Sequence, residues 1–130
     1  MKRVLSFLSG IFAILVVTFS GCEAQIKSIS VDDLQTLLQT DSTTVLVDVR
    51  NENEFVGRMD KIKQAIHIPL GELESRISEL EKYKDKPVYL ICRSGNRSGI
   101  ATRKLTEMGF DAINVSGGML AYSKKYRANE

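Results

Sequence analysis

Short apolar runs alternate along the chain with stretches in which apolar residues recur every three or four positions. The runs are rich in β-branched residues, which is typical of buried parallel strands. We expect strands over residues 25–29, 45–49, 65–68, 88–91 and 113–115. The three-and-four spacing predicts helices over residues 31–40, 51–57, 70–83, 97–108 and 117–127, with Ser30 and Asp33 spaced to cap the first. This alternation indicates one α/β domain with a mainly parallel sheet, over residues 26–127.

The first 21 residues follow the order of an export signal. Basic residues at 2–3 precede an apolar run over 4–19, and small residues at 20–21 lead directly to Cys22. The sequence Phe-Ser-Gly-Cys over residues 19–22 resembles the lipobox of bacterial lipoproteins, with Phe19 where that class usually has leucine. The resemblance implies a signal peptide over residues 1–21 and a lipid-modified Cys22 as the mature N-terminus.

Two other interpretations of this segment stay open. Residues 4–21 are long enough for an uncleaved membrane anchor, and an ordinary signal peptide would leave Cys22 unmodified. All three interpretations predict an exported domain on the periplasmic or cell-surface side. The lipobox adds attachment to the membrane through a lipid.

Charge and cysteine content narrow the chemistry. The chain has 18 basic and 16 acidic residues, and without Lys2 and Arg3 the charges balance at 16 each. A neutral domain has no overall attraction to nucleic acid, so an anion site has to be local. The two cysteines, one of them predicted to be lipidated, leave Cys92 without a disulfide partner. With a single histidine, His67, no conventional zinc cluster can form, and we expect no metal.

The segment Cys92-Arg93-Ser94-Gly95-Asn96-Arg97-Ser98 carries the strongest chemical signal. It follows a predicted buried strand and leads into a helix, the place where α/β sheets bind ligands. Backbone N–H groups at such a helix start point towards an anion, and glycine lets the loop curl around it. These groups and the two arginines favour the thiolate, so we expect Cys92 to be a nucleophile. The alternative is a buried structural cysteine, which these polar neighbours argue against.

This loop resembles the active-site loop of single-domain rhodaneses. Three other segments are similar to motifs of that family and occur in the family's order: Val47-Asp48-Val49-Arg50 with Glu54-Phe55, Ala65-Ile66-His67-Ile68-Pro69-Leu70, and Gly117-Gly118-Met119 with Ala121-Tyr122. The resemblance covers about 80 residues. It implies a five-stranded, mainly parallel sheet flanked by helices on both faces.

The resemblance also implies a reaction. Cys92 would take the outer sulfur of a small anionic donor such as thiosulfate, hold it as a persulfide, and pass it to a thiol or protein acceptor. Residues 93–98 would bind the substrate: Arg93, Ser94, Gly95, Asn96, Arg97 and Ser98. Arg97 stands where the family often places a basic residue for the donor. No metal or organic cofactor is implied, and we expect a monomer.

Two other functions on this fold remain as alternatives. One is a binding module without turnover, although such modules usually lack the cysteine. The other is an oxyanion enzyme, a phosphatase or arsenate reductase. The related phosphatases place five residues between cysteine and arginine, whereas four separate Cys92 from Arg97.

Other polar residues near the predicted strand ends are expected to be structural. Asp48, Arg50 and Glu54 fit an ion-pair network, and His67 alternates with apolar neighbours as in a strand. The chain departs from the family pattern over residues 58–64, which are about three residues longer than usual and lack the family's histidine and second glycine. We expect this departure to affect substrate preference and to leave the fold intact.

Overall fold

The computed structural model describes residues 25–57 and 60–126. The predicted signal segment, Cys22, the first two residues of the longer 58–64 segment and the predicted helix end at Arg127 lie outside the described residues. Within the described ranges, no helix combines the length and apolar character needed to cross a membrane.

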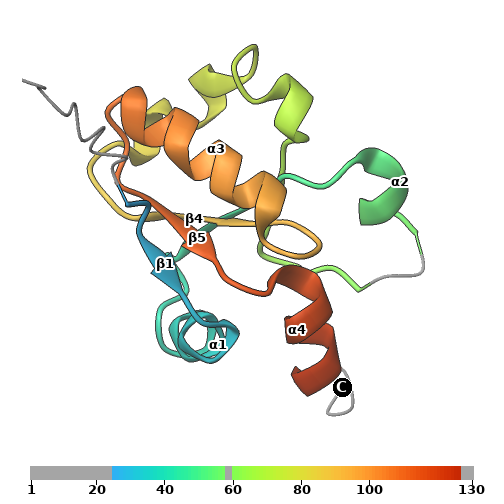
Figure 1. Ribbon diagram of the computed structural model, residues 1–130. Coiled ribbons are helices and arrows are strands. Elements are labelled where there is room, and N and C mark those ends of the chain that lie inside the picture. The colour runs from blue at the N-terminus through green and yellow to red at the C-terminus, as the bar shows by residue number, and fades with distance from the viewer. Residues whose placement is uncertain (1–24, 58–59, 127–130) are drawn as a thin grey trace, which may run out of the picture.

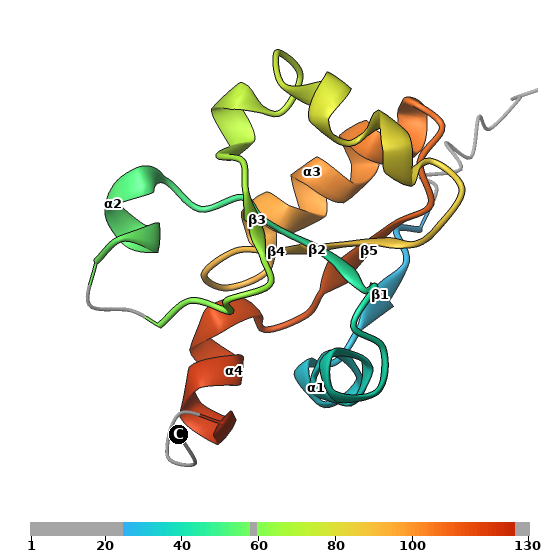
Figure 2. The same cartoon turned by 180° about the vertical axis from the view of Figure 1, so that it is seen from behind.

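The centre of the domain is a five-stranded parallel sheet (Figures 1 and 2). The strands are β1 (Ser28–Ile29), β2 (Val45–Asp48), β3 (Ile66–His67), β4 (Val88–Ile91) and β5 (Ala112–Val115). They lie in the order β1-β5-β4-β2-β3, and each pair is parallel. β2 and β4, the apolar runs of the sequence, are buried along most of their length in the middle of the sheet.

In the described part of the chain, four α-helices connect or follow the strands: α1 (Val31–Thr40), α2 (Glu52–Phe55), α3 (Asn96–Glu107) and α4 (Gly118–Tyr126). The predicted cap of α1 is confirmed. The Ser30 hydroxyl accepts from the Asp33 N–H at 3.1 Å, and the Ser30 N–H donates to the Asp33 carboxylate at 3.3 Å. α3 begins at Asn96, one residue earlier than expected, so the loop after β4 is short.

The helix predicted over residues 70–83 is wrong. The structure has three 3₁₀ turns there: η1 (Leu70–Glu72), η2 (Ile77–Glu79) and η3 (Glu81–Tyr83). The i, i+3 spacing of Leu70 with Leu73 and of Ile77 with Leu80 places both residues of a pair on one side of a 3₁₀ turn, as it would in an α-helix. Leu73 and Leu80 are fully buried, so the apolar pattern reports burial correctly here but not the helix type.

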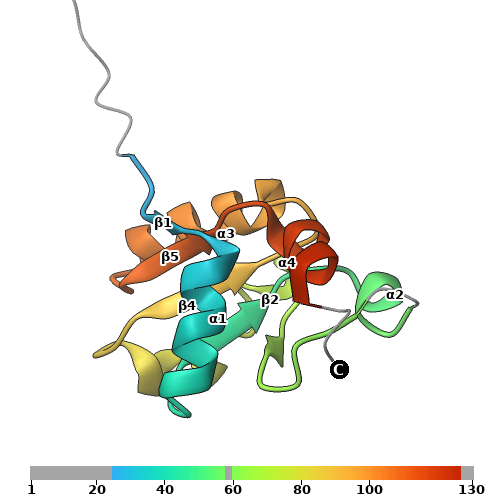
Figure 3. The same ribbon diagram turned by 90° about the horizontal axis from the view of Figure 1, so that it is seen from below.

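Helices cover both faces of the sheet, which confirms the predicted layers (Figure 3). On one face, α3 and the 3₁₀ turns pack over an apolar cluster that includes Val47, Leu90 and Leu105. On the other, α1 and α4 enclose a second cluster around Leu46 and Met119. The carboxyl ends of β2, β4 and β5 therefore open onto the starts of α2, α3 and α4, where the predicted site residues lie.

Candidate active site

Cys92 directly follows β4 and stands at the start of a short loop into α3. Its side chain is buried, with 1% of the residue exposed, and it borders the apolar cluster beneath α3. Arg93, Ser94 and Asn96 are exposed around it. The cysteine is thus as buried as a structural cysteine would be, and the groups that face its sulfur decide its chemistry.

Two donors from the loop and the first turn of α3 contact the sulfur. The Gly95 N–H donates to Cys92 Sγ at 3.1 Å, and the Ser98 hydroxyl lies 3.3 Å from the same atom. Gly95 has φ +105°, a left-handed conformation that turns its N–H back towards the cysteine. Burial raises the pKa of Cys92, but hydrogen bonds from Ser98 and from the loop N–H groups outweigh burial and lower that pKa below its ordinary value. These hydrogen bonds therefore stabilise the thiolate relative to that of an unperturbed cysteine.

The start of α4 binds the carbonyls of Cys92 and Arg93. The Met119 N–H donates to Cys92 O at 2.8 Å, and the Leu120 N–H donates to Arg93 O at 3.0 Å. Gly118 makes this contact possible: its φ is +57°, and a Cβ atom there would lie 2.5 Å from Cys92 O and 2.6 Å from Arg93 O. The second glycine of the C-terminal motif is therefore a requirement of the site's geometry.

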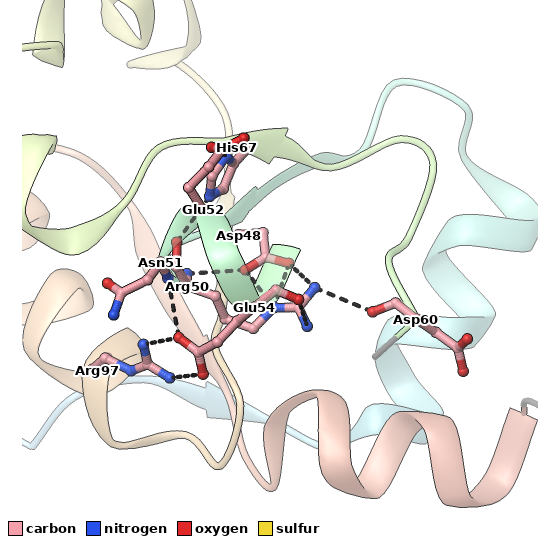
Figure 4. A network of polar contacts seen from close by, with 8 residues as sticks. All are labelled: Asp48, Arg50, Asn51, Glu52, Glu54, Asp60, His67 and Arg97. Carbon is pink, nitrogen blue, oxygen red and sulfur yellow. Dashed lines mark hydrogen bonds and ion pairs between the residues drawn. The ribbon is translucent and has the colours of Figure 1, made fainter. Parts of the chain in front are cut away.

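A buried ion pair supports the neighbouring strand end (Figure 4). Arg50 Nη2 lies 2.7 Å from Asp48 Oδ2, and neither side chain is more than 1% exposed. Arg50 Nε and the Arg50 N–H also donate to Asp48 Oδ1, both at 3.0 Å. Further bonds from the guanidinium to the carbonyls of Glu54 and Asp60 tie α2 and the following segment to this pair.

Glu54 and Arg97 form a second, partly exposed pair (Figure 4). Arg97 Nη1 and Nη2 lie 2.5 Å and 2.7 Å from the two carboxylate oxygens of Glu54. The hydrogen bonds that Arg97 donates lower the pKa of Glu54 to about 2, and the same bonds raise the pKa of Arg97. The arginine expected to bind an anionic donor thus already holds a carboxylate within the protein.

His67 lies behind this network and has no contact with Cys92 among the described hydrogen bonds. Its Nε2–H donates to the Arg50 carbonyl at 2.8 Å, its Nδ1 lies 3.3 Å from Glu52, and its ring stacks on Phe55 with centroids 4.0 Å apart. These contacts hold α2 against β3.

The structure adds one residue that the sequence analysis did not single out. Asn114 lies on β5 with 7% of its surface exposed, and its Oδ1 is 2.6 Å from the Ser98 hydroxyl. A polar residue within the apolar run 112–115 was the available signal, since buried polar groups need partners.

Comparison with known proteins assigns the family. Residues 30–125 match the model of the rhodanese-like domain, and the chain belongs to that family. It is 40% identical over 98 residues to "Putative sulfurtransferase YtwF" of Bacillus subtilis, covering 75% of this chain and 91% of that protein. It is 31% identical over 121 residues to "Putative thiosulfate sulfurtransferase, mitochondrial" of Schizosaccharomyces pombe, covering 79% and 84%.

The fold agrees with a solved structure of the same family. A rhodanese-like domain protein from Staphylococcus aureus superposes with a TM-score of 0.69 at 33% identity, covering 75% of this chain and 91% of that one. The predicted rhodanese-like fold is confirmed.

Proposed function

We propose that this protein is a sulfurtransferase in which Cys92 carries the transferred sulfur. The Cys92 thiolate attacks the outer sulfur of a small anionic donor such as thiosulfate. The S–S bond of the donor breaks, sulfite leaves with the bonding electron pair, and Cys92 becomes a persulfide. An acceptor thiolate then attacks the outer sulfur, forming a persulfide on the acceptor and returning the Cys92 thiolate. Neither step requires a metal or organic cofactor.

The observation that carries the proposal is the arrangement around Cys92 Sγ. A thiolate is the reactive form of cysteine, and a buried one needs hydrogen-bond donors. The Gly95 N–H at 3.1 Å and the Ser98 hydroxyl at 3.3 Å supply them, and the sulfur stands before the N-terminus of the 12-residue α3. The same donors can stabilise the negative charge that passes between donor, cysteine and acceptor.

The size of the loop supports sulfur over phosphoryl chemistry. Four residues lie between Cys92 and Arg97, and α3 begins at Asn96, so the loop is short and its Gly95 N–H reaches Cys92 Sγ at 3.1 Å. The names of two relatives, which refer to sulfur transfer, point the same way.

Substrate contacts fall to the exposed side of the loop. Arg93 is exposed beside Cys92, while Arg97 is paired with Glu54. A dianionic donor can therefore contact the exposed Arg93 directly, whereas it has to share Arg97 with the Glu54 carboxylate. A protein or low-molecular-weight thiol is the proposed acceptor, and we propose that the monomer acts outside the cytoplasm, anchored through a lipid on Cys22.

The test is mass spectrometry of the full chain after incubation with thiosulfate. We expect a gain of about 32 Da, one sulfur atom, on the peptide that contains Cys92, and its loss on addition of cyanide. Cys22→Ala provides the matched control, because it removes the other cysteine and should keep the gain. Cys92→Ser should abolish it. Sulfur found on another residue, or transfer activity retained by Cys92→Ser, would overturn the proposal.

A further inference from the structure

The Ser98 hydroxyl has more acceptors around it than it has protons. Its Oγ lies 2.6 Å from Asn114 Oδ1, 3.2 Å from Gly95 O and 3.3 Å from Cys92 Sγ. A hydroxyl donates one hydrogen bond at a time, so the hydroxyl proton cannot serve all three atoms. Which atom receives the proton depends on whether Cys92 itself carries one.

With Cys92 as a thiol, the observed contacts form a complete chain. The S–H donates to Ser98 Oγ, and the hydroxyl donates to Asn114 Oδ1 over the shortest of the three distances. Every atom then has a partner of the right kind. The observed orientation of the Asn114 amide, with its oxygen towards Ser98, fits this thiol state.

With Cys92 as a thiolate, the same orientation of the Asn114 amide leaves two acceptors facing each other. The hydroxyl proton is needed at the sulfur, which leaves Ser98 Oγ and Asn114 Oδ1 facing each other at 2.6 Å with no proton between them. Two oxygen acceptors at that distance repel, and a buried polar group without a partner is costly. Turning the amide by 180° removes the conflict, because Nδ2–H then donates to Ser98 Oγ.

The surroundings of Asn114 permit that turn. Among the described residues, Nδ2 in the observed orientation donates to Gly95 O over a long 3.4 Å, so the loss of this hydrogen bond is small. After the turn Oδ1 would face Gly95 O at about that distance instead of the 2.6 Å that separates it from Ser98 Oγ, and Gly95 O keeps its hydrogen bond from the Gly99 N–H at 3.0 Å. The strand backbone stays fixed, since the Asn114 N–H donates to Lys27 O at 2.9 Å. Gly99, opposite the amide, has no side chain, and even a Cβ there would lie 3.7 Å from Nδ2.

We propose that Asn114 is a positioning residue whose side-chain amide reverses its orientation when Cys92 changes between thiol and thiolate. In the thiol it accepts from Ser98, and in the thiolate it donates to Ser98, which in turn donates to the sulfur. One proton leaves the sulfur for solvent, and no covalent bond of Ser98 or Asn114 breaks. The inference deepens the proposed function, on which it rests, by naming the group that lets one site hold both forms of the sulfur.

Few charged groups lie near the Cys92–Ser98–Asn114 chain of hydrogen bonds, called the relay below. Arg97 on α3 interacts with the Cys92 charge and is itself paired with Glu54 of α2. The Asp48–Arg50 pair stands at the end of β2, next to β4, and Arg93 lies exposed on the loop. β5 and the first turn of α4 contain no titratable residue.

The first test follows the Asn114 side-chain amide by NMR in the full chain, held in detergent micelles, across the titration of Cys92. We expect the Nδ2H₂ resonances to shift with the midpoint of the thiol, followed independently by its ultraviolet absorbance. In Ser98→Ala the size of this pH-dependent shift should fall at least about fivefold, because the hydroxyl that transmits the change is gone. Resonances that do not titrate, or that titrate equally in Ser98→Ala, would overturn the proposal.

The second test replaces the amide by a group that only accepts. Asn114→Asp should hold the Ser98 proton away from the sulfur and raise the pKa of Cys92 by about one unit. The charge introduced by Asn114→Asp would also raise this pKa directly, without Ser98, so the same substitution is made in the Ser98→Ala background, where only this direct part of the rise should remain. Equal rises in both backgrounds would overturn the relay. Neither measurement requires sulfur transfer, so failure of the proposed function would show separately, as a missing Cys92 persulfide.

Discussion

Each carboxylate oxygen of Glu54 accepts from one terminal nitrogen of Arg97, at 2.5 Å and 2.7 Å. This parallel pairing is the strongest geometry available to a guanidinium, and it joins α2 to the first turn of α3 beside Cys92. An arginine held in this way offers little net positive charge to an incoming dianion. If the protein transfers sulfur as proposed, we expect this pair to set how strongly an anionic donor binds.

Glu54→Gln should improve the use of thiosulfate. The amide keeps nearly the same shape but removes the charge that neutralises Arg97, so we expect KM for thiosulfate to fall by about three- to tenfold with kcat little changed. Arg97→Ala should raise KM by about one to two orders of magnitude. Steady-state kinetics checks both, with alkylation of Cys92 by a neutral reagent as the control that should change far less. Wild-type kinetics in Arg97→Ala would contradict this account.

The same pair predicts how stability depends on pH. Arg97 lowers the pKa of Glu54 from 4.5 to about 2, so the folded protein binds this proton less readily than the unfolded chain does. The contribution is complete above the unfolded pKa and is lost as pH falls through the window between the two values. Urea unfolding between about pH 5 and about pH 2 should show a steeper loss in the wild type than in Glu54→Gln. Parallel curves would show that the pair adds no stability.

Gly118→Ala should damage the site and the fold together. The added Cβ would meet Cys92 O at 2.5 Å, and φ at this position is +57°, so we expect a loss of at least about 1 kcal/mol in the free energy of unfolding. The loop should shift, and the pKa of Cys92, measured from the pH dependence of alkylation, should rise. Gly71→Ala is the matched control, because nothing lies within 4 Å of its Cβ and its φ is not positive. An unchanged thiol in Gly118→Ala would show that α4 does not shape the loop.

The buried Asp48–Arg50 pair should be costly to break. Asp48→Asn leaves the Arg50 guanidinium charged with both side chains almost wholly buried, and we expect a loss of about 3–5 kcal/mol in the free energy of unfolding. Asp111→Asn breaks the exposed Lys27–Asp111 pair instead and should cost less than about 1 kcal/mol. Denaturant unfolding of the two variants gives the comparison, and similar losses would contradict the expected dependence on burial.

Cys22→Ala tests the lipoprotein interpretation. Expressed in a bacterium, the wild-type chain should partition into the detergent phase in a processed form, because the segment before Cys22 has the order of a lipoprotein signal. The variant should be processed abnormally. A variant that remains membrane-bound and migrates like the wild type would favour an uncleaved anchor.

The strands and the position of Cys92 at the start of a strand-to-helix loop were predictable because their signals are local. The apolar run 88–91 ends directly before Cys92, and the polar loop with its glycine follows at once. The helix of residues 70–83 was mispredicted because buried 3₁₀ turns and an α-helix share the i, i+3 spacing. A local apolar pattern predicts which side of a segment is buried more reliably than it predicts whether the segment is an α-helix or a series of 3₁₀ turns.

The partners of the site residues are separated widely in sequence and could not be read from spacing. Glu54 and Arg97 are 43 residues apart, and Ser98 and Asn114 are 16 apart. Only the strand order, which places β4 between β2 and β5, brings their elements to one edge of the sheet. The positions of Asp48, Arg50 and Glu54 near a strand end predicted an ion-pair network, but not that Arg97 would pair with Glu54.

The contact between α4 and the loop makes the environment of Cys92 depend on the last element of the chain to be synthesised. The Met119 and Leu120 N–H groups that orient Cys92 and Arg93 come after every strand of the sheet in the chain. In a polypeptide still emerging from the ribosome these two hydrogen bonds are absent, so the proposed function leads us to expect Cys92 to behave there as an ordinary thiol. A copy truncated before α4 should likewise react more slowly at Cys92 than the folded protein.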